Sequence, residues 1–212
     1  MSNLEEGLSA YEASEFGKAF QILMPLAESG NPQAQKVIAH MYDLGQSVET
    51  NCTEAIKWYR LSAQQGDRVA QNNLATFLWD DSPEEAIQWY ILSAEQELPF
   101  AQEVLGEIYS GNFSISGIKD HQYRDDPKAV TWYMKAAQKG FPIACHRLGD
   151  MYAAGQGVNQ DFNQAVSWYR KAAEKDYKPS QEVLATAYQQ GLLGLPQDEE
   201  LARYWLERSQ KS

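Results

Sequence analysis

Apolar residues recur along the chain at helical spacing, in two kinds of segment that alternate. The first kind reads AIKWYRLSAQQG at 55–66 and AVSWYRKAAEKD at 165–176, and the second reads AQKVIAHMYDLG at 34–45 and ACHRLGDMYAAG at 144–155. Residues three and four apart lie on one face of an α-helix, so each segment predicts an amphipathic helix. The helix of the second kind is named helix A, and the helix that follows it is named helix B.

The recurrence of both segments indicates a repeat protein built from antiparallel helix pairs. A lone helix pair cannot bury its apolar stripe, whereas stacked neighbours bury it between them. The sequence therefore predicts an all-α solenoid of about six helix pairs. The first alanine of each helix B marks the copies: Ala19, Ala55, Ala86, Ala129, Ala165 and Ala202.

Residues that favour helix ends separate these segments. Three residues able to cap a helix stand directly before a proline: Asn31, Ser82 and Asp126. We expect each side chain to accept a hydrogen bond at a helix start. Glycines that suit a left-handed backbone follow three B segments: Gly30, Gly66 and Gly140. Glu97 stands at this position in a fourth copy.

The segment LGDMYAAGQGVNQDFNQAVSWYRKAAEKD at 148–176 resembles a Sel1-like repeat, a relative of the tetratricopeptide repeat. Five copies resemble it: 32–66, 68–97, 99–140, 142–176 and 178–210. Residues 3–29 resemble a tetratricopeptide-like leading helix pair. The resemblance implies a right-handed α-α superhelix that acts as an adaptor or scaffold in protein complexes.

A helical wheel at about 100° per residue places one row of A-helix residues away from the packing stripe. In tetratricopeptide-type solenoids that face lines a concave groove, so we expect the row to contact a protein or peptide partner. Plain solvation of a polar row is the alternative. The candidates are Lys36, His40, Asp43, Asn72, Asn73, Thr76, Trp79, Phe100, Glu103, Glu107, His146, Arg147, Asp150, Glu182 and Thr186.

Trp79 breaks the pattern of the other tryptophans. Five of them recur three residues after the B-helix alanine and are expected to lie in the core: Trp58, Trp89, Trp132, Trp168 and Trp205. Trp79 falls in the A-helix row, so it is a candidate anchor for a partner. The alternative is that it fills space at the shortened turn that ends in Ser82-Pro83. A long loop at 110–126 supplies further contact candidates: His121, Tyr123 and Arg124.

The net charge of −11 argues against nucleic acid as a partner and against an anionic membrane surface. Residues 1–106 hold 5 Lys and Arg against 16 Asp and Glu, whereas residues 107–212 hold 13 of each. This imbalance is typical of a solvated face or of a surface that attracts a basic partner. No apolar run reaches the roughly 18 residues of a membrane span. The acidic first residues lack the basic start of a secretory signal, which favours the cytoplasm unless a leader has been removed.

Catalytic and metal-binding patterns are weak. The two cysteines, Cys52 and Cys145, stand in different repeats and are expected to be free thiols. Cys145 and His146 are adjacent on a helix, so we expect one core residue and one exposed residue, and no metal site or cofactor. Ser116 and Lys119 match the Ser-x-x-Lys of penicillin-recognising enzymes without its companion motifs.

The predicted function is a non-enzymatic adaptor. The alternatives are a Sel1-like hydrolase or penicillin-binding protein, an immunity or regulatory protein that neutralises a partner, and a self-assembling structural module. Whether the chain forms homo-oligomers stays open.

Overall fold

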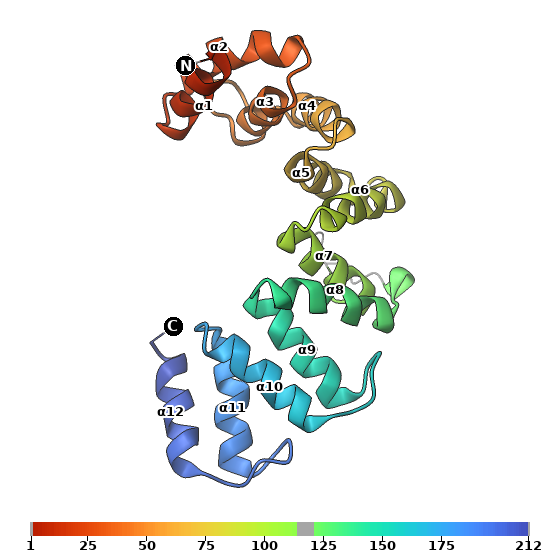
Figure 1. The fold of residues 1–212 in the computed structure, drawn as a ribbon, viewed down its shortest axis with the longest axis vertical. Helices are drawn as coiled ribbons and strands as arrows, with labels where there is room; N and C mark the ends of the chain where they lie inside the picture. The colour runs from red at the N-terminus through yellow and green to blue at the C-terminus, as the bar shows by residue number, and fades with distance from the viewer. Residues whose placement is uncertain (1, 114–120, 212) are drawn as a thin grey trace. The chain divides into compact units, whose positions relative to one another are not determined.

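The computed structural model describes residues 2–113 and 121–211. These residues form twelve α-helices and one short 3-10 helix, and no strand occurs among them (Figure 1). The helices are α1 (Asn3–Glu12), α2 (Phe16–Glu28), α3 (Pro32–Leu44), α4 (Cys52–Gln64), α5 (Arg68–Leu78), α6 (Pro83–Glu95), α7 (Pro99–Ser110), η1 (His121–Tyr123), α8 (Asp126–Gln138), α9 (Pro142–Ala154), α10 (Phe162–Ala173), α11 (Lys178–Gln190) and α12 (Glu199–Ser209).

Consecutive helices pack in pairs, from α1 with α2 to α11 with α12. The chain divides into two compact units, residues 1–98 with α1–α6 and residues 99–212 with α7–α12. Within each unit, the second helix of a pair also packs on the first helix of the next pair. The predicted all-α fold of about six helix pairs is confirmed.

Close packing inside a pair depends on a B-helix tyrosine and a small A-helix residue. Tyr133 of α8 is fully buried against Gly106 of α7, where a Cβ would collide with the ring. Tyr169 of α10 packs on Gly149 of α9 in the same way, and a Cβ there would lie 2.6 Å from the ring carbon Cδ1. Glycine at these two positions therefore lets the tyrosine ring reach the backbone of the neighbouring helix.

Buried glutamines join one helix pair to the next. Three of them stand at the same position of an A helix, directly after Ala34, Ala70 and Ser180, and their side chains are almost wholly buried: Gln35, Gln71 and Gln181. Each side-chain amide donates to a carbonyl near the end of the preceding B helix, at 3.0–3.1 Å from the oxygens of Ala27, Ala63 and Ala173. Each carbonyl also accepts a backbone N–H from the turn that ends its helix, at 3.0–3.1 Å. The bond therefore satisfies the buried amide of the glutamine, which burial would otherwise penalise.

The capping predictions are partly confirmed. Asn31 accepts a hydrogen bond from the backbone of Ala34 at 3.0 Å, as expected. Ser82 precedes α6 without a side-chain capping bond. The prediction for Asp126 is wrong, because Asp125 caps α8 and Asp126 is already helical. Asp and Asn cap several other helix starts, among them Asn51, Asp67, Asp161 and Asp198.

The left-handed residues after the B helices are confirmed. Gly30, Gly66 and Gly140 have φ between 86° and 98°. Glu97 and Asp176 hold the equivalent positions with φ of 59° and 60°, in the left-handed region that residues other than glycine seldom adopt.

The recurrent tryptophans pack less uniformly than the sequence predicts. Trp58, Trp168 and Trp205 are buried, whereas Trp89 and Trp132 are half-buried. The amino group of Lys135 lies 4.1 Å from the centre of the Trp132 ring and so covers an exposed part of it. The core role is therefore confirmed for three of the five.

We expect Gly149→Ala to destabilise the fold by about 1–3 kcal/mol, because the added methyl group overlaps the buried ring of Tyr169. The free energy of unfolding is measured by urea denaturation. Gly17→Ala in α2 is the matched control, since the atom nearest its new Cβ is Ser47 Oγ at 3.4 Å. The free energy of unfolding of this control should stay the same or rise by up to about 1 kcal/mol, because alanine has a higher helix propensity than glycine. Equal stability of the two variants would contradict the role of the glycine contact.

Candidate partner-binding surface

The predicted row in residues 1–98 runs along α3 and α5. Lys36 pairs with Asp67, with Nζ 2.9 Å from Oδ2, and the ring of His40 accepts or donates a hydrogen bond with the Tyr11 hydroxyl. Asp43 is half-buried one turn farther along α3. Two of the three row residues on α3 are therefore engaged with other helices of the same unit.

The α5 part of the row is mixed in exposure. Asn72 is buried and donates to the side-chain oxygen of Asn73 at 3.2 Å. Thr76 is exposed, and its hydroxyl lies 2.9 Å from the hydroxyl of Tyr90. Trp79 is half-buried at the residue that ends α5. The row therefore reaches solvent at Thr76 and at part of the Trp79 ring.

In residues 99–212, an ion pair joins two adjacent A helices. Arg147 of α9 donates through Nε to Glu107 of α7 at 2.7 Å and through Nη2 at 3.3 Å. The hydroxyl of Tyr133 donates to the same carboxylate at 2.9 Å. Because charge-assisted bonds with two contacts hold both partners in one geometry, Glu107 and Arg147 form a fixed part of this face.

Glu103 lies one turn before Glu107 and is buried, with 9% of its surface exposed. Burial, and after it the charge of Glu107, raise the pKa of the Glu103 carboxyl to about 7, against the opposing charge of Arg147. Glu103 is therefore partly protonated near neutral pH. The expectation that it faces solvent is wrong, because the A-helix surface is covered there.

His146, Asp150 and Ser180 are arranged like a catalytic triad. The imidazole Nδ1 lies 2.8 Å from Ser180 Oγ, and Nε2 lies 3.6 Å from Asp150 Oδ2. Ser180 is completely buried and His146 is 8% exposed, so a substrate has no access to the hydroxyl. Burial lowers the pKa of His146 and opposes the charged state, although Asp150 favours it. The arrangement links α9 to α11 and supports no hydrolysis, which needs an accessible nucleophile.

The prediction that one of Cys145 and His146 is exposed is wrong, because both are buried. Two tyrosines cover the His146 face: its ring centre lies 5.5 Å from that of Tyr169 in the same helix pair and 5.3 Å from that of Tyr177, which precedes α11 of the next pair. Cys145 is a free thiol, as is the exposed Cys52. Cys145 stands where other copies have the buried glutamine, directly after the first A-helix alanine.

B-helix tyrosines also contribute to the row, which the sequence analysis missed. The hydroxyls of Tyr90, Tyr133 and Tyr169 reach A-helix side chains of the row in their own helix pairs. For Tyr169 the contact is a hydrogen bond of 2.7 Å to Asp150 Oδ1. The recurrent Trp-Tyr dipeptide is the signal for these contacts, since its tyrosine falls in one register in every one of these copies.

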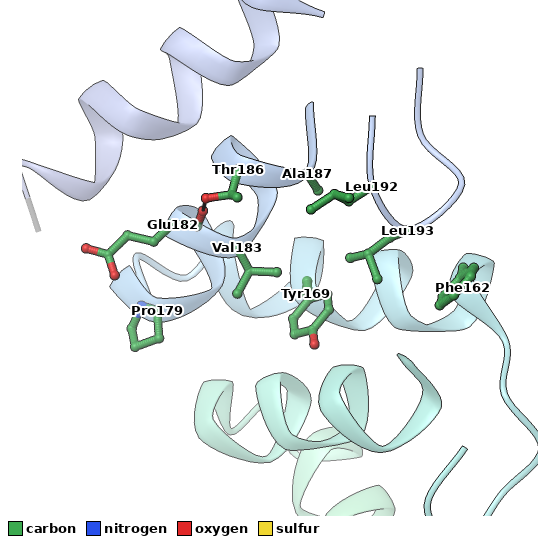
Figure 2. Close-up of a pocket in the computed structure, with 9 residues that line it drawn as sticks. All are labelled: Phe162, Tyr169, Pro179, Glu182, Val183, Thr186, Ala187, Leu192 and Leu193. Atoms are coloured by element: carbon green, nitrogen blue, oxygen red, sulfur yellow. Dashed lines mark hydrogen bonds between the residues drawn. The ribbon is translucent and has the colours of Figure 1, made fainter. Parts of the chain in front are cut away.

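An open, mainly apolar hollow of about 580 Å³ adjoins the row at its end in this unit. Figure 2 shows how α10, α11 and the loop after α11 bring its side chains together. Its lining residues are Phe162, Tyr169, Pro179, Glu182, Val183, Thr186, Ala187, Leu192 and Leu193. Glu182 and Thr186 were predicted from the row, and the apolar residues were not.

One apolar residue of the hollow, Leu192, departs from the repeat. Leu192 follows the left-handed glycine that ends α11, at the place that Gln46 and Gln156 occupy after α3 and α9. The three backbone N–H groups donate to equivalent carbonyls at 2.9 Å, which establishes the equivalence. Phe162 begins α10, and the first residue of the other B helices varies, with Phe16 in α2 and Asp126 in α8. An apolar residue at a position that is polar in other copies is thus the sequence signal for this hollow.

The remaining predicted site residues lie in the first turn of α7 and in the loop at 110–126. Phe100 is 51% exposed in the first turn of α7. Ser116 and Lys119 lie at 114–120, the part of the loop at 110–126 that is outside the described residues. In the described part of that loop, Tyr123 is half-buried and Arg124 pairs with Asp126 at 2.9 Å.

The solvent-facing row that the sequence predicts is therefore wrong at three positions, which are buried: Asn72, Glu103 and His146. No group of three potential metal ligands occurs among residues 2–113 and 121–211. In the same ranges, every helix is too short or too polar to cross a bilayer.

Glu103→Gln tests the buried carboxyl. The folded chain holds the Glu103 proton more tightly than the unfolded chain, so wild type loses stability as the pH rises from about 4.5 to about 7. The variant does not titrate and is expected to exceed wild type by about 1–3 kcal/mol at pH 8 and to match it near pH 4. Urea denaturation at both pH values measures the difference. A pH-independent difference between wild type and Glu103→Gln would refute the expectation.

The family model of the Sel1 repeat matches residues 32–67, 69–98, 115–141, 142–177 and 179–209. Among solved structures, the chain is similar to a Sel1 repeat protein from Oxalobacter formigenes, with 33% identity over 98% of this chain and 84% of that one and a TM-score of 0.88. It is also similar to a protective antigen of uropathogenic Escherichia coli, with 27% identity, a TM-score of 0.69, and coverage of 99% of this chain and 53% of that one.

An immunity protein from Pseudomonas aeruginosa shares the fold at 16% identity and a TM-score of 0.54, over 97% of this chain and 81% of that one. A comparison with curated protein sequences gave no match. Sel1 repeat proteins generally mediate protein–protein interactions, and their fold is typically a non-catalytic interaction module. Because the five matched repeats span most of its length, this chain belongs to the Sel1 repeat family.

Proposed function

We propose that this chain is a non-catalytic adaptor that binds a basic protein or peptide along the A-helix row, with Trp79 as an anchor in residues 1–98. The observation that carries the proposal is the half-buried indole of Trp79 beside the exposed Thr76. Other copies have Asp43, Ser110, Ala153 and Gln189 at its place, so packing between repeats does not require an aromatic there. A tryptophan that keeps part of its ring in solvent is a residue type that often dominates binding energy.

Charge supports a basic partner for this unit. Residues 1–98 hold five Lys and Arg against fifteen Asp and Glu. Four of the five cations already pair with a carboxylate of the same unit: Lys18, Lys36, Lys57 and Arg60. The surface therefore keeps a large excess of acidic groups, which raises the rate of encounter with a basic partner and lowers it at high salt.

The alternatives have less support. A hydrolase needs an accessible nucleophile, and Ser180 of the triad-like group is completely buried. The immunity protein of Pseudomonas aeruginosa is similar in fold alone, so it names no partner for this chain. A purely structural role for Trp79, in which it fills the short turn before Pro83, is the hypothesis that the experiment must separate from the anchor.

We expect Trp79→Ala to weaken binding of the partner about thirtyfold, or by roughly 2 kcal/mol, while the melting temperature changes little. The partner is first captured from the native host with wild type as bait, identified by mass spectrometry and purified. Its affinity for wild type and for the variant is then measured by calorimetry, at low and at high salt.

Leu44→Ala is the control, because Leu44 is also an exposed apolar residue of this unit, at 55%, and lies outside the row. It should leave both affinity and melting temperature nearly unchanged. If Trp79→Ala lowers the melting temperature by many degrees while the affinity of the folded fraction stays the same, Trp79 is a packing residue and not an anchor.

A further inference from the structure

The hollow in residues 99–212 is lined by apolar side chains that the fold leaves uncovered. Phe162 is 40% exposed and Leu192 is 45% exposed, and both lie at its edge. Residues of a repeat that serve packing recur, because each copy meets the same kind of neighbour. The positions equivalent to Leu192 are polar at Gln46 and Gln156, so packing between repeats does not account for this leucine.

The edge of the hollow also carries a carboxylate. Glu182 is exposed on α11 and lines both this hollow and a second one of about 540 Å³ on the other side of the helix. Thr186, one turn later, is likewise shared by the two. The second hollow is mixed in charge, with Glu199 and Arg203 from α12. A ligand that fills the apolar hollow therefore has an acidic group within reach at its edge.

We propose that the hollow binds a peptide segment of a protein partner, through a bulky apolar side chain with a Lys or Arg beside it in the sequence. The apolar side chain occupies the space between Phe162, Val183 and Leu192, and the cation pairs with Glu182. This inference rests on the proposed function, because it takes protein binding as given, and adds a second contact site to the one at Trp79.

The size and chemistry of the hollow fit this occupant. Sites that bury a ligand measure about 300–1,000 Å³, and the observed 580 Å³ lies within that range. Binding energy at interfaces concentrates where a large apolar residue fills such a depression and polar groups surround it. The carboxylate of Glu182 is complementary to a basic group and repels an acidic one, which gives the site a charge preference.

The test uses variants that restore the residues of other copies. Phe162→Asp with Leu192→Gln places at both positions the residues found at Asp126 and at Gln156. The double variant should melt near the wild-type temperature, because an acidic residue suits a helix start and glutamine replaces a half-exposed leucine. Leu201→Gln is the matched control, since Leu201 is 37% exposed on α12 and lines neither hollow.

A random twelve-residue peptide library displayed on phage is selected in parallel against the wild-type chain and the double variant. Wild type should enrich peptides with a bulky apolar residue next to Lys or Arg, and the double variant should not. Synthetic copies of the enriched peptides should bind the double variant at least tenfold more weakly and the Leu201→Gln control equally well. Glu182→Gln should weaken binding severalfold and reduce its salt dependence, whereas Glu207→Gln on α12 should change neither.

Three outcomes would overturn the inference. Enriched peptides that bind wild type and the double variant equally place the contact elsewhere, and adaptor function then survives without this site. Enrichment of the same peptides by both baits, or of none by wild type, shows that the hollow does not select peptides. Uptake of a small apolar dye by wild type alone, without any peptide enrichment, assigns the hollow to a small molecule. Because Trp79 lies in the other unit, its variant fails or succeeds independently of these results.

Discussion

The fold depends on the burial of a B-helix tyrosine ring against a small A-helix residue. At Gly106 and Gly149 the ring lies so close that the smallest side chain would overlap it. This contact sets the separation of the two helices in a pair. It also directs the tyrosine hydroxyl through the pair toward the A-helix row, where Tyr133 meets Glu107 and Tyr169 meets Asp150. The same side chain therefore provides packing on its ring and a fixed hydrogen bond at the candidate surface.

Stacking of successive pairs adds a polar constraint to this apolar one. In three A helices a buried glutamine bonds to one carbonyl of the preceding pair, so it specifies how one pair sits on the next. Gln35 and Gln71 are themselves hydrogen-bonded by Gln65 and Gln96, each at 2.8 Å, which fixes the orientation of their amides. At Cys145 a thiol replaces the amide, and the neighbouring His146 bonds to Ser180 of the next pair instead. A polar contact between successive helix pairs is thus made by glutamine in three A helices and by His146 in α9.

The fold could be predicted because its helix pairs recur in the sequence, whereas parts of the candidate site do not recur and could not be predicted. The helix pairs, the left-handed glycines and the glycine contacts recur, so the copies in one sequence serve as an alignment. Burial of Glu103 and His146 did not follow from the helical wheel, because a wheel describes one helix and the neighbouring pair covers part of its far face. The apolar hollow combines residues from two helices and a loop, although its exception at Leu192 was visible in the sequence.

The two units offer surfaces of different physical character. In residues 99–212 Arg147 lies close to two carboxylates of the row, 2.7 Å from Glu107 and 3.8 Å from Asp150. Binding at the proposed hollow would therefore draw mainly on apolar burial, with Glu182 as its charged contact. In residues 1–98 most cations are already paired and an acidic excess remains, so long-range attraction acts there and depends on salt. For a partner that has both a basic surface and an apolar residue next to a cation, electrostatic attraction to residues 1–98 would raise the association rate. Apolar burial in the hollow of residues 99–212 would lower the dissociation rate. The two rates would then depend on different sets of residues.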